Sequence, residues 1–270
     1  MSKTDDPALD RFLARLLLRS PLTSDERAAI LNLGGRAVQV DARQDFVETG
    51  REIGVACLVV DGLVARFDQT ADGLRQTTAL YMAGDMCNLH AVVSPVRGGG
   101  LQALTSATVC RISQAGLREL AAKYPAIAFA FWRDTVADAS VLAKWVSIVG
   151  SRSARSRIAH LLCEMGVRSE QAAIGSRTDF PLPMTQSQIA EALALTAVHV
   201  NRSMRILREE GLMIMQNRRV LVERWDELAT VAEFDPQHLL VELRPGSIAA
   251  RDAVRPSTRQ PDTRASSPPS

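Results

Sequence analysis

Several features that mark secreted, membrane-bound or metal-cluster proteins are missing from this sequence of 270 residues. It has four cysteines and no C-x-x-C pair, so we expect buried free thiols rather than disulfides. No run of about 20 apolar residues occurs, and the N-terminus MSKTDDPALDRF is polar and acidic. We therefore expect neither a membrane span nor a signal peptide, and a cytoplasmic location.

Motifs of the common enzyme classes are also missing. There is no H-E-x-x-H, no Walker or dinucleotide glycine pattern and no convincing set of paired acids. The one glycine run, at 98–100, is not followed by Lys-Ser or Lys-Thr. We therefore expect no enzyme activity, no catalytic residue, no cofactor and no metal site.

Lysine is scarce, and the positive charge is unevenly distributed. The chain has three Lys against 29 Arg, and its net charge is only +2. Residues 151–224 hold eleven Arg and seven acidic residues, whereas residues 1–150 hold sixteen basic and sixteen acidic ones. A local positive excess of this kind favours a nucleic-acid partner for the second half of the chain.

That half contains two short amphipathic helices in the stretch MTQSQIAEALALTAVHVNRSMRILREEGL. Thr185 is a good N-cap, and Gln188 stands where a capping box places Glu or Gln. A second cap, Thr196, opens a helix that runs to Glu210. The apolar positions at helical spacing are Ile189, Ala192 and Leu193 in the first helix and Val200, Met204 and Leu207 in the second. This pattern predicts a helix-turn-helix.

A wing follows. Gly211 ends the second helix, and residues 212–215 and 220–222 are short apolar runs joined by a polar, basic tip. An αα-hairpin inside a helical core is the alternative, but the exposed face of the second helix carries His, Asn and Arg, which suit base edges and phosphates. The predicted DNA contacts are Gln186, Ser187, Ala197, Val198, His199, Asn201, Arg202, Ser203, Arg205, Arg218 and Arg219.

This stretch, with the wing and the following LATVAEFDPQHL, resembles the DNA-binding domain of the Crp/Fnr superfamily of bacterial transcription regulators. The resemblance extends over roughly residues 10–240. It implies that Arg202 reads guanine, and that the partners are double-stranded DNA, a second copy of the chain, RNA polymerase and an unidentified small-molecule effector. Ala194 stands where the superfamily often has Gly in the turn. Ala can occupy most turn positions with a negative φ, so the motif is kept, but the sequence leaves the geometry of this turn open.

The first half of the chain predicts short helices followed by strands. Leucines at helical spacing and a cap at Thr23 or Ser24 predict two helices within 9–33, and from Arg36 the apolar period changes to two. Asp61-Gly62 lies between VACLVV and LVARF and predicts a two-residue type I′ hairpin. The simplest fold for these short strands is an antiparallel β-roll or jelly roll that ends near residue 112.

V-x-D-G-L-V and the later M-A-G-D are similar to the cyclic-nucleotide-binding β-roll of the same superfamily. The resemblance implies an effector pocket around Gly84, Asp85, Leu89 and Arg97. The ribose-binding Glu of the superfamily falls on or near Leu89, and its phosphate-binding Arg falls in the 98–100 glycine run. We therefore expect that cyclic AMP does not bind tightly.

Two His/Cys pairs could suggest metal or haem ligation. Cys87 and His90 are three residues apart, and His160 and Cys163 share a helical face. Two ligands make no site, so we expect packing roles for all four. Because residues 1–56 hold no Cys, we also expect no iron–sulfur cluster of the N-terminal kind.

Residues 126–149 lack Gly and Pro and predict one long helix. Its predicted dimer seam is Ile127, Phe131, Val141, Trp145 and Ile148.

The predicted fold is therefore α+β: an N-terminal antiparallel β-roll, a long dimerisation helix and a C-terminal winged helix-turn-helix. The expected parts are 1–35 (helical segment), 36–115 (β-roll sensor), 116–150 (dimerisation helix), 151–240 (DNA-binding domain) and 241–270 (disordered tail). The expected function is a homodimeric regulator that reads an inverted repeat in response to a signal. The alternative is a cyclic-nucleotide-sensing or haem/redox-sensing module that acts mainly through a protein partner.

Overall fold

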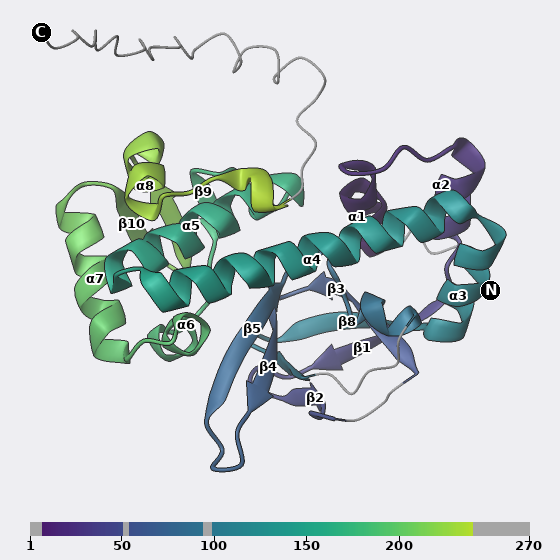
Figure 1. Ribbon diagram of the computed structural model, residues 1–270, viewed down its shortest axis with the longest axis horizontal. Helices are drawn as coiled ribbons and strands as arrows, with labels where there is room; N and C mark the ends of the chain where they lie inside the picture. The colour runs from purple at the N-terminus through teal and green to yellow at the C-terminus, as the bar shows by residue number, and fades with distance from the viewer. Residues whose placement is uncertain (1–6, 51–53, 94–98, 240–270) are drawn as a thin grey trace, which may run out of the picture.

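The computed structural model describes residues 7–50, 54–93 and 99–239, so Arg97 and the tail at 241–270 lie outside the described residues. The fold is α+β, as predicted. Figure 1 shows one long helix crossing the whole molecule, with two short helices at its N-terminal end, a β-roll along its middle and a winged domain at its C-terminal end. None of the helices in these ranges is long and apolar enough to cross a membrane.

The chain begins with α1 (Pro7–Leu17) and α2 (Ser24–Leu31). Thr23, rather than Ser24, caps α2: its hydroxyl accepts from the Glu26 N–H, and the Glu26 carboxylate accepts from the Thr23 N–H at 2.7 Å. The apolar face of α1 is buried against the β-roll and the long helix. Its members are Leu9, Phe12, Leu13 and Leu16. The two helices therefore close one end of the roll.

The β-roll consists of two antiparallel four-stranded sheets. The first has the order β1 (Gly35–Val40), β8 (Ala107–Ser113), β3 (Val55–Asp61) and β6 (Met86–Cys87). The second has the order β2 (Asp45–Val47), β7 (Gly100–Ala103), β4 (Val64–Gln69) and β5 (Arg75–Tyr81). Both sheets contribute to an apolar core that includes Val59, Val64, Leu101 and Val109. A short 3₁₀ helix, η1 (Leu89–Val92), follows β6.

The predicted Asp61-Gly62 hairpin is wrong. β3 and β4 lie in different sheets, so these residues turn a corner between the sheets instead of joining paired strands. Only Gly62 has a positive φ (+90°), and a Cβ there would lie 2.6 Å from the Ser106 carbonyl oxygen. Glycine is required by this close approach of two backbones, which a local turn signal cannot distinguish from a hairpin.

Two helices follow the roll: α3 (Gln114–Lys123) and the long α4 (Pro125–Ser151). The long helix is confirmed. Its predicted dimer seam is wrong, because residues of that seam pack against the interior of the same chain. Phe131 and Trp145 are each 5% exposed and pack inside the chain. Six exposed apolar residues of α4 form a different row, called the α4 stripe below, which consists of Phe129, Trp132, Val136, Ala139, Ala143 and Val146; Leu142 is also exposed and lies outside this row.

The winged domain begins at α5 (Ala154–Gln171), and its first strand is β9 (Asp179–Pro181). Then come α6 (Gln186–Leu193), α7 (Ala197–Glu209), β10 (Met213–Gln216) and β11 (Arg219–Val222). The last elements are α8 (Trp225–Ala232) and the 3₁₀ helix η2 (Pro236–Leu239). α5 is buried along most of its length and forms the centre of this domain.

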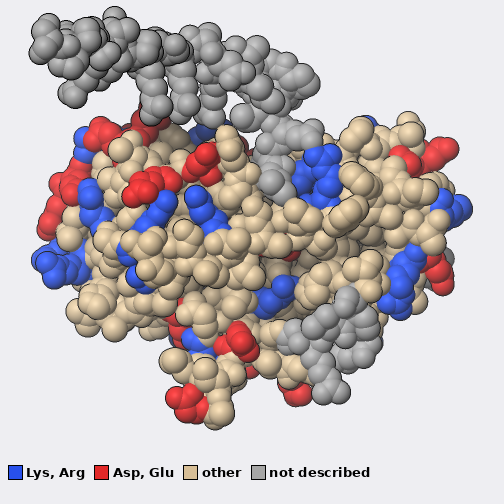
Figure 2. All heavy atoms as spheres, viewed as in Figure 1, with Lys and Arg blue, Asp and Glu red and all other residues tan. Residues whose placement is uncertain are grey.

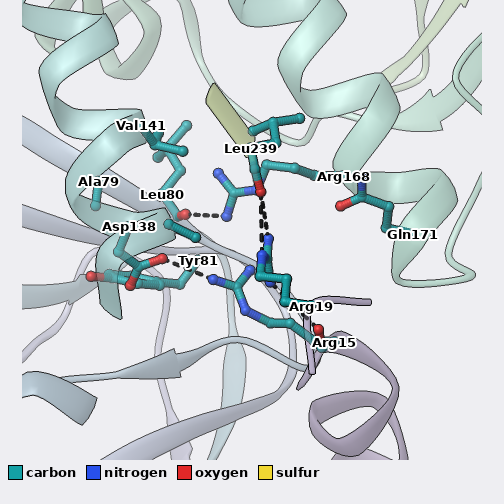
Figure 3. A pocket seen from close by; sticks show the side chains of 11 residues that line it. Arg15, Arg19, Ala79, Leu80, Tyr81, Asp138, Val141, Arg168, Gln171 and Leu239 are labelled. Atoms are coloured by element: carbon teal, nitrogen blue, oxygen red, sulfur yellow. Dashed lines mark hydrogen bonds and ion pairs between the residues drawn. The ribbon is translucent and has the colours of Figure 1, made fainter. Parts of the chain in front are cut away.

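A buried network of ion pairs joins α1, the β-roll and α5. Asp85 lies at its centre, with one oxygen 2.6 Å from Arg15 Nη1 and the other 2.8 Å from Arg168 Nη2. Arg15 also binds Asp134 and Asp138 of α4, at 2.8 Å each. Figure 3 shows Arg15, Arg19 and Arg168 converging between the helices, with Arg168 also donating to the Leu80 carbonyl at 2.6 Å. This network positions the winged domain against the roll.

Candidate nucleic-acid interface

The first helix of the predicted motif has the expected cap. The Thr185 hydroxyl accepts from the Gln188 N–H at 3.2 Å, and the Gln188 side chain accepts from the Thr185 N–H at 2.8 Å. This capping box satisfies two N–H groups that would otherwise lack a helical partner. Gln186 and Ser187 follow it, and both are exposed at the helix N-terminus. Free N–H groups and polar side chains at such an end suit a phosphate.

The structure decides the turn geometry at Ala194, which the sequence left open. This residue ends α6 in the left-handed region, with φ +50° and ψ +50°. Its N–H donates to the Ala190 carbonyl, and Arg157 Nη1 donates to the Leu193 carbonyl at 3.0 Å. The surrounding hydrogen bonds therefore impose a backbone conformation that costs an L-residue about 1–2 kcal/mol.

Ala194→Gly should therefore stabilise the protein by about 0.5–1 kcal/mol, because relief of the strain exceeds the extra chain entropy of glycine. Denaturant unfolding at fixed protein concentration measures the difference. Ala192→Gly, within the same helix, is the matched control and should lose about 1 kcal/mol or more. Equal losses in both variants would contradict the strain assigned to Ala194.

The second helix, α7, buries one side and exposes the other. Thr196 caps it by accepting from the His199 N–H at 3.2 Å. The buried positions are Val200, Ser203 and Leu207. Ser203 was predicted to contact phosphate, but it is 5% exposed, because its three-residue spacing from Val200 places it on the core side. The exposed side, called the reading face below, consists of Ala197, Val198, His199, Asn201, Arg202 and Arg205.

The wing is present, with a tighter tip than predicted. β10 and β11 pair from Met213↔Val222 to Gln216↔Arg219, so only Asn217 and Arg218 form the turn. Both have positive φ, +51° and +60°, as a type I′ turn requires. The sequence prediction missed β9, which pairs with β11 and completes a three-stranded sheet.

The two wing arginines differ in environment. Arg218 is exposed at the tip. Arg219 Nη2 lies 2.7 Å from Asp179 Oδ1 on β9, so its charge is partly neutralised. Phosphate binding by Arg219 would compete with this ion pair, and Arg218 is therefore the stronger candidate.

The helix-turn-helix motif contacts the β-roll, and these contacts leave the reading face exposed. Gln76 Nε2 of β5 donates to the Glu191 carbonyl at 2.8 Å, and Gln188 Nε2 donates to the Leu104 carbonyl at 3.1 Å. Leu80 and Met82 of the roll belong to the same apolar cluster as Leu193. These contacts use α6, so α7 stays open to solvent at the left edge of Figure 2, where basic side chains are visible.

A cavity of about 480 Å³ lies between the β-roll and α4. Arg66, Tyr81 and His90 line it from the roll, and Thr135 and Leu142 line it from α4. The Tyr81 hydroxyl is buried and has no hydrogen-bond partner. Burial and, more weakly, Arg66 lower the pKa of His90, so its imidazole is neutral at pH 7. The cavity therefore offers a cation, a hydroxyl and a neutral imidazole to a small molecule, and the carboxylates of Asp68 and Asp138 also line it.

None of the four residues predicted for the effector pocket is among the described residues that line this cavity. Asp85 is engaged by Arg15 and Arg168, and Gly84 packs so closely on α1 that a Cβ there would lie 2.8 Å from Arg11 Cβ. Leu89 is 3% exposed and belongs to an apolar core, and Arg97 lies outside the described residues. The directions of these side chains come from packing between elements, which a sequence motif does not reveal.

The cysteines occupy apolar surroundings. All four are buried, and burial raises the pKa of Cys57 to about 11 and of Cys163 to about 12, so both remain protonated thiols. Cys87 lies on β6 opposite Cys57, whereas His90 lines the cavity. His160 and Cys163 also form no ligand group together within the described ranges.

Comparison with known proteins agrees with this architecture. Residues 156–231 match the family described as the Crp-like helix-turn-helix domain. The chain is 24% identical over 216 residues to the regulatory protein HlyX of Actinobacillus pleuropneumoniae, covering 80% of this chain and 90% of that protein. It is 23% identical over 223 residues to the fumarate and nitrate reduction regulatory protein of Escherichia coli, covering 83% and 89%.

Solved structures share the fold. FixK2 from Bradyrhizobium japonicum superposes with a TM-score of 0.67 at 21% identity, over 74% of this chain and 98% of that one. A CRP-family transcriptional regulator from Thermus thermophilus gives 0.57 at 19% identity, over 73% and 97%. With its β-roll, long helix, winged helix-turn-helix and these relatives, the chain belongs to the Crp/Fnr superfamily of DNA-binding transcription regulators.

Proposed function

We propose that two copies of this chain bind an inverted repeat in double-stranded DNA, with α7 of each copy in a major groove. The observation that carries the proposal is the reading face, which is exposed along α7 while the opposite side of the helix is buried. Its Arg202 has the rigid donor fork that recognises guanine O6 and N7 together. Gln186, Ser187 and Arg218 flank this face and can bind phosphates.

The α4 stripe supports the dimer. Its six members are spaced 3, 4, 3, 4 and 3 residues apart, which is the a/d repeat of a coiled coil. In Figure 2 the surface over α4 is largely free of charged side chains. A solvent-exposed row of Phe, Trp and Val is unusual for a monomer, and pairing with the same row of a second copy buries it.

The cavity beside α4 is the proposed effector site. Its walls come from both the β-roll and the helix that we expect to form the dimer, so a bound molecule would act on the dimer geometry directly. Arg66 and the unpartnered Tyr81 hydroxyl can donate to an acceptor group of the effector, whereas Asp68 and Asp138 in the same lining disfavour a strongly anionic molecule. The regulator so controlled would act in the cytoplasm on transcription by RNA polymerase.

Arg202→Ala is the test of the reading assignment. Selection from random duplexes should yield an operator with one preferred guanine per half-site, and the variant should lose that preference, about 1–3 kcal/mol of discrimination. Arg208→Ala, on an exposed position of the last turn of α7, is the matched control and should keep it.

Arg218→Ala should behave differently from Arg202→Ala. It should weaken binding to all duplexes alike and reduce the salt dependence, because phosphate contacts carry no sequence information. Should Arg202→Ala select the same operator with the same affinity as the wild type, α7 is not the reading helix.

A further inference from the structure

Three potential metal ligands from distant parts of the chain converge beside α5. They are His160 and Glu164, one helical turn apart on α5, and His238 on η2, and their ligand atoms all lie within 4.8 Å of one another. The side chains of His160, Glu164 and His238 are 2%, 0% and 8% exposed. The cluster is separate from the reading face and from the cavity beside α4.

Three of the four imidazole nitrogens at this cluster make no hydrogen bond to the described residues. Neither ring nitrogen of His160 makes a hydrogen bond, and neither does Nε2 of His238. His160 Nε2 and His238 Nε2 lie 3.8 and 3.7 Å from the same oxygen, Glu164 Oε2, which is too far for a hydrogen bond. Buried polar atoms without partners are rare, and each one requires a physical explanation.

The hydrogen bond of His238 shows that its Nδ1 carries a proton. Its Nδ1 lies 2.6 Å from the Asp235 carbonyl oxygen, which can only accept, so Nδ1 carries the proton. In the neutral imidazole, Nε2 then presents a lone pair toward Glu164 Oε2, which also presents lone pairs. Metal-bound histidines commonly show this arrangement, with one nitrogen donating to a carbonyl and the other binding the ion.

We propose that His160, Glu164 and His238 bind a divalent transition metal ion of the zinc class. Two imidazoles and one carboxylate are a common three-ligand set for zinc, and a water molecule can occupy the fourth position. Zinc bonds of about 2.0–2.1 Å in tetrahedral geometry place ligand atoms about 3.4 Å apart. The two His–Glu separations, 3.8 and 3.7 Å, are a few tenths of an ångström longer, and the ligand atoms as a set lie within 4.8 Å of one another, so the side chains would move closer around the ion.

Neighbouring groups already orient the carboxylate. Trp145 Nε1 of α4 donates to Glu164 Oε2 at 2.8 Å, and Arg168 Nη1 donates to Oε1 at 3.2 Å. Supporting hydrogen bonds of this kind fix a metal-binding carboxylate. The charge of Arg168 is offset by Asp85 at 2.8 Å, so it does not stand unbalanced beside the ion. Phe234 packs edge-on against His160, with ring centroids 5.1 Å apart, and limits access of water.

Such an ion would connect three segments of the chain. Its ligands come from α5 at the start of the winged domain and from η2 near the end of the described chain, while Trp145 ties the carboxylate to α4. Metal binding would therefore stiffen the connection between α4 and the DNA-binding domain. The sequence alone predicted no metal site because His238 is far from Glu164 along the chain, and Cys163, which was paired with His160 there, is not in the group.

The full-length protein, stripped with a chelator, should bind one Zn²⁺ per chain in a competition titration against a chromophoric chelator. His238→Gln and Glu164→Gln should each weaken binding by more than about 100-fold, since loss of a supporting residue alone costs about 10–100-fold. Both variants can be checked for folding by circular dichroism. His90→Gln and His199→Gln are the matched controls and should bind as the wild type does.

Co²⁺ substitution provides the second measurement. The wild type should show the intense visible absorption of a tetrahedral site, without the thiolate-to-metal band that cysteine ligation would add. Zn²⁺ should raise the Tm of the wild type and leave that of folded His238→Gln unchanged. No stoichiometric binding by the wild type, undiminished affinity in His238→Gln, or a thiolate band would each overturn the proposal. None of these measurements uses DNA, so they are independent of the function proposed above.

Discussion

Trp132→Asp should convert the dimer to a monomer and abolish tight operator binding. Trp132 is 63% exposed at the centre of the aromatic half of the α4 stripe. In a paired helix the new carboxylate would face its twin in an apolar seam, where a buried, unpaired charge is strongly unfavourable. Because two linked half-site contacts exceed either one by about 10²–10⁴ in affinity, the monomer should lose at least about 100-fold on the palindromic site.

Sedimentation equilibrium and gel-shift titration measure the two effects. Ala28→Asp adds the same charge at an exposed position of α2, away from the stripe, and should remain a dimer with normal DNA binding. Phe131→Asp and Trp145→Asp are unsuitable tests, because both residues pack inside the chain and the variants would unfold. A Trp132→Asp protein of dimer mass would exclude the α4 stripe as the interface.

Asp85→Asn should destabilise the protein by about 3 kcal/mol at pH 7. The substitution keeps the shape of the side chain but removes the negative charge between Arg15 and Arg168, and breaking a buried ion pair costs about 3–5 kcal/mol. We expect the lower end of this range, because Arg15 would still pair with Asp134 and Arg168 would still pair with Glu164. Denaturant unfolding at a fixed protein concentration measures the loss, since the proposed dimerisation would contribute to apparent stability.

The loss should depend on pH in a defined direction. Burial raises the pKa of the Asp85 carboxyl, but Arg15 and Arg168 together outweigh burial and hold it below its ordinary value. A lowered folded-state pKa gives stability that is present above the unfolded pKa of about 3.9 and disappears as the pH falls through the folded pKa. The difference in the free energy of unfolding between the wild type and Asp85→Asn should therefore become smaller as the pH falls.

Glu170→Gln is the control for the Asp85 experiment. Glu170 also pairs with an arginine, Arg177 at 2.5 Å, but both side chains are at least 40% exposed. Exposed pairs of this kind contribute about 0–1 kcal/mol. Equal losses from Glu170→Gln and Asp85→Asn at pH 7 would show that the network around Asp85 has no special role in stability.

Local signals in the sequence were sufficient for the helices of the DNA-binding domain. Thr185, Gln188 and Thr196 make the predicted capping bonds, and the spacing of Val200 and Leu207 correctly gave the buried side of α7. These features depend on residues within one or two helical turns, so the sequence contains all the information they need. The exposed positions of Arg202 and His199 follow from the same period.

Two features of the chain depend on distant residues. The sequence left the turn geometry at Ala194 open, and Arg157, 37 residues away, binds the carbonyls of this turn. Asp85 was expected in an effector pocket, but Arg15 and Arg168 bind it from two other elements. No short window of sequence around Ala194 or Asp85 contains these arginines.

By itself, then, the sequence determined the two capped helices of the DNA-binding motif, where that motif begins and ends, and the buried positions Val200 and Leu207 of α7, because short-range capping and hydrophobic period decide those. Only the tertiary structure decided which apolar row of α4 stays exposed, which groups line the cavity, and that His238 returns to face His160 and Glu164. Those arrangements come from burial of whole elements against one another, and a one-dimensional pattern does not specify which face each element buries.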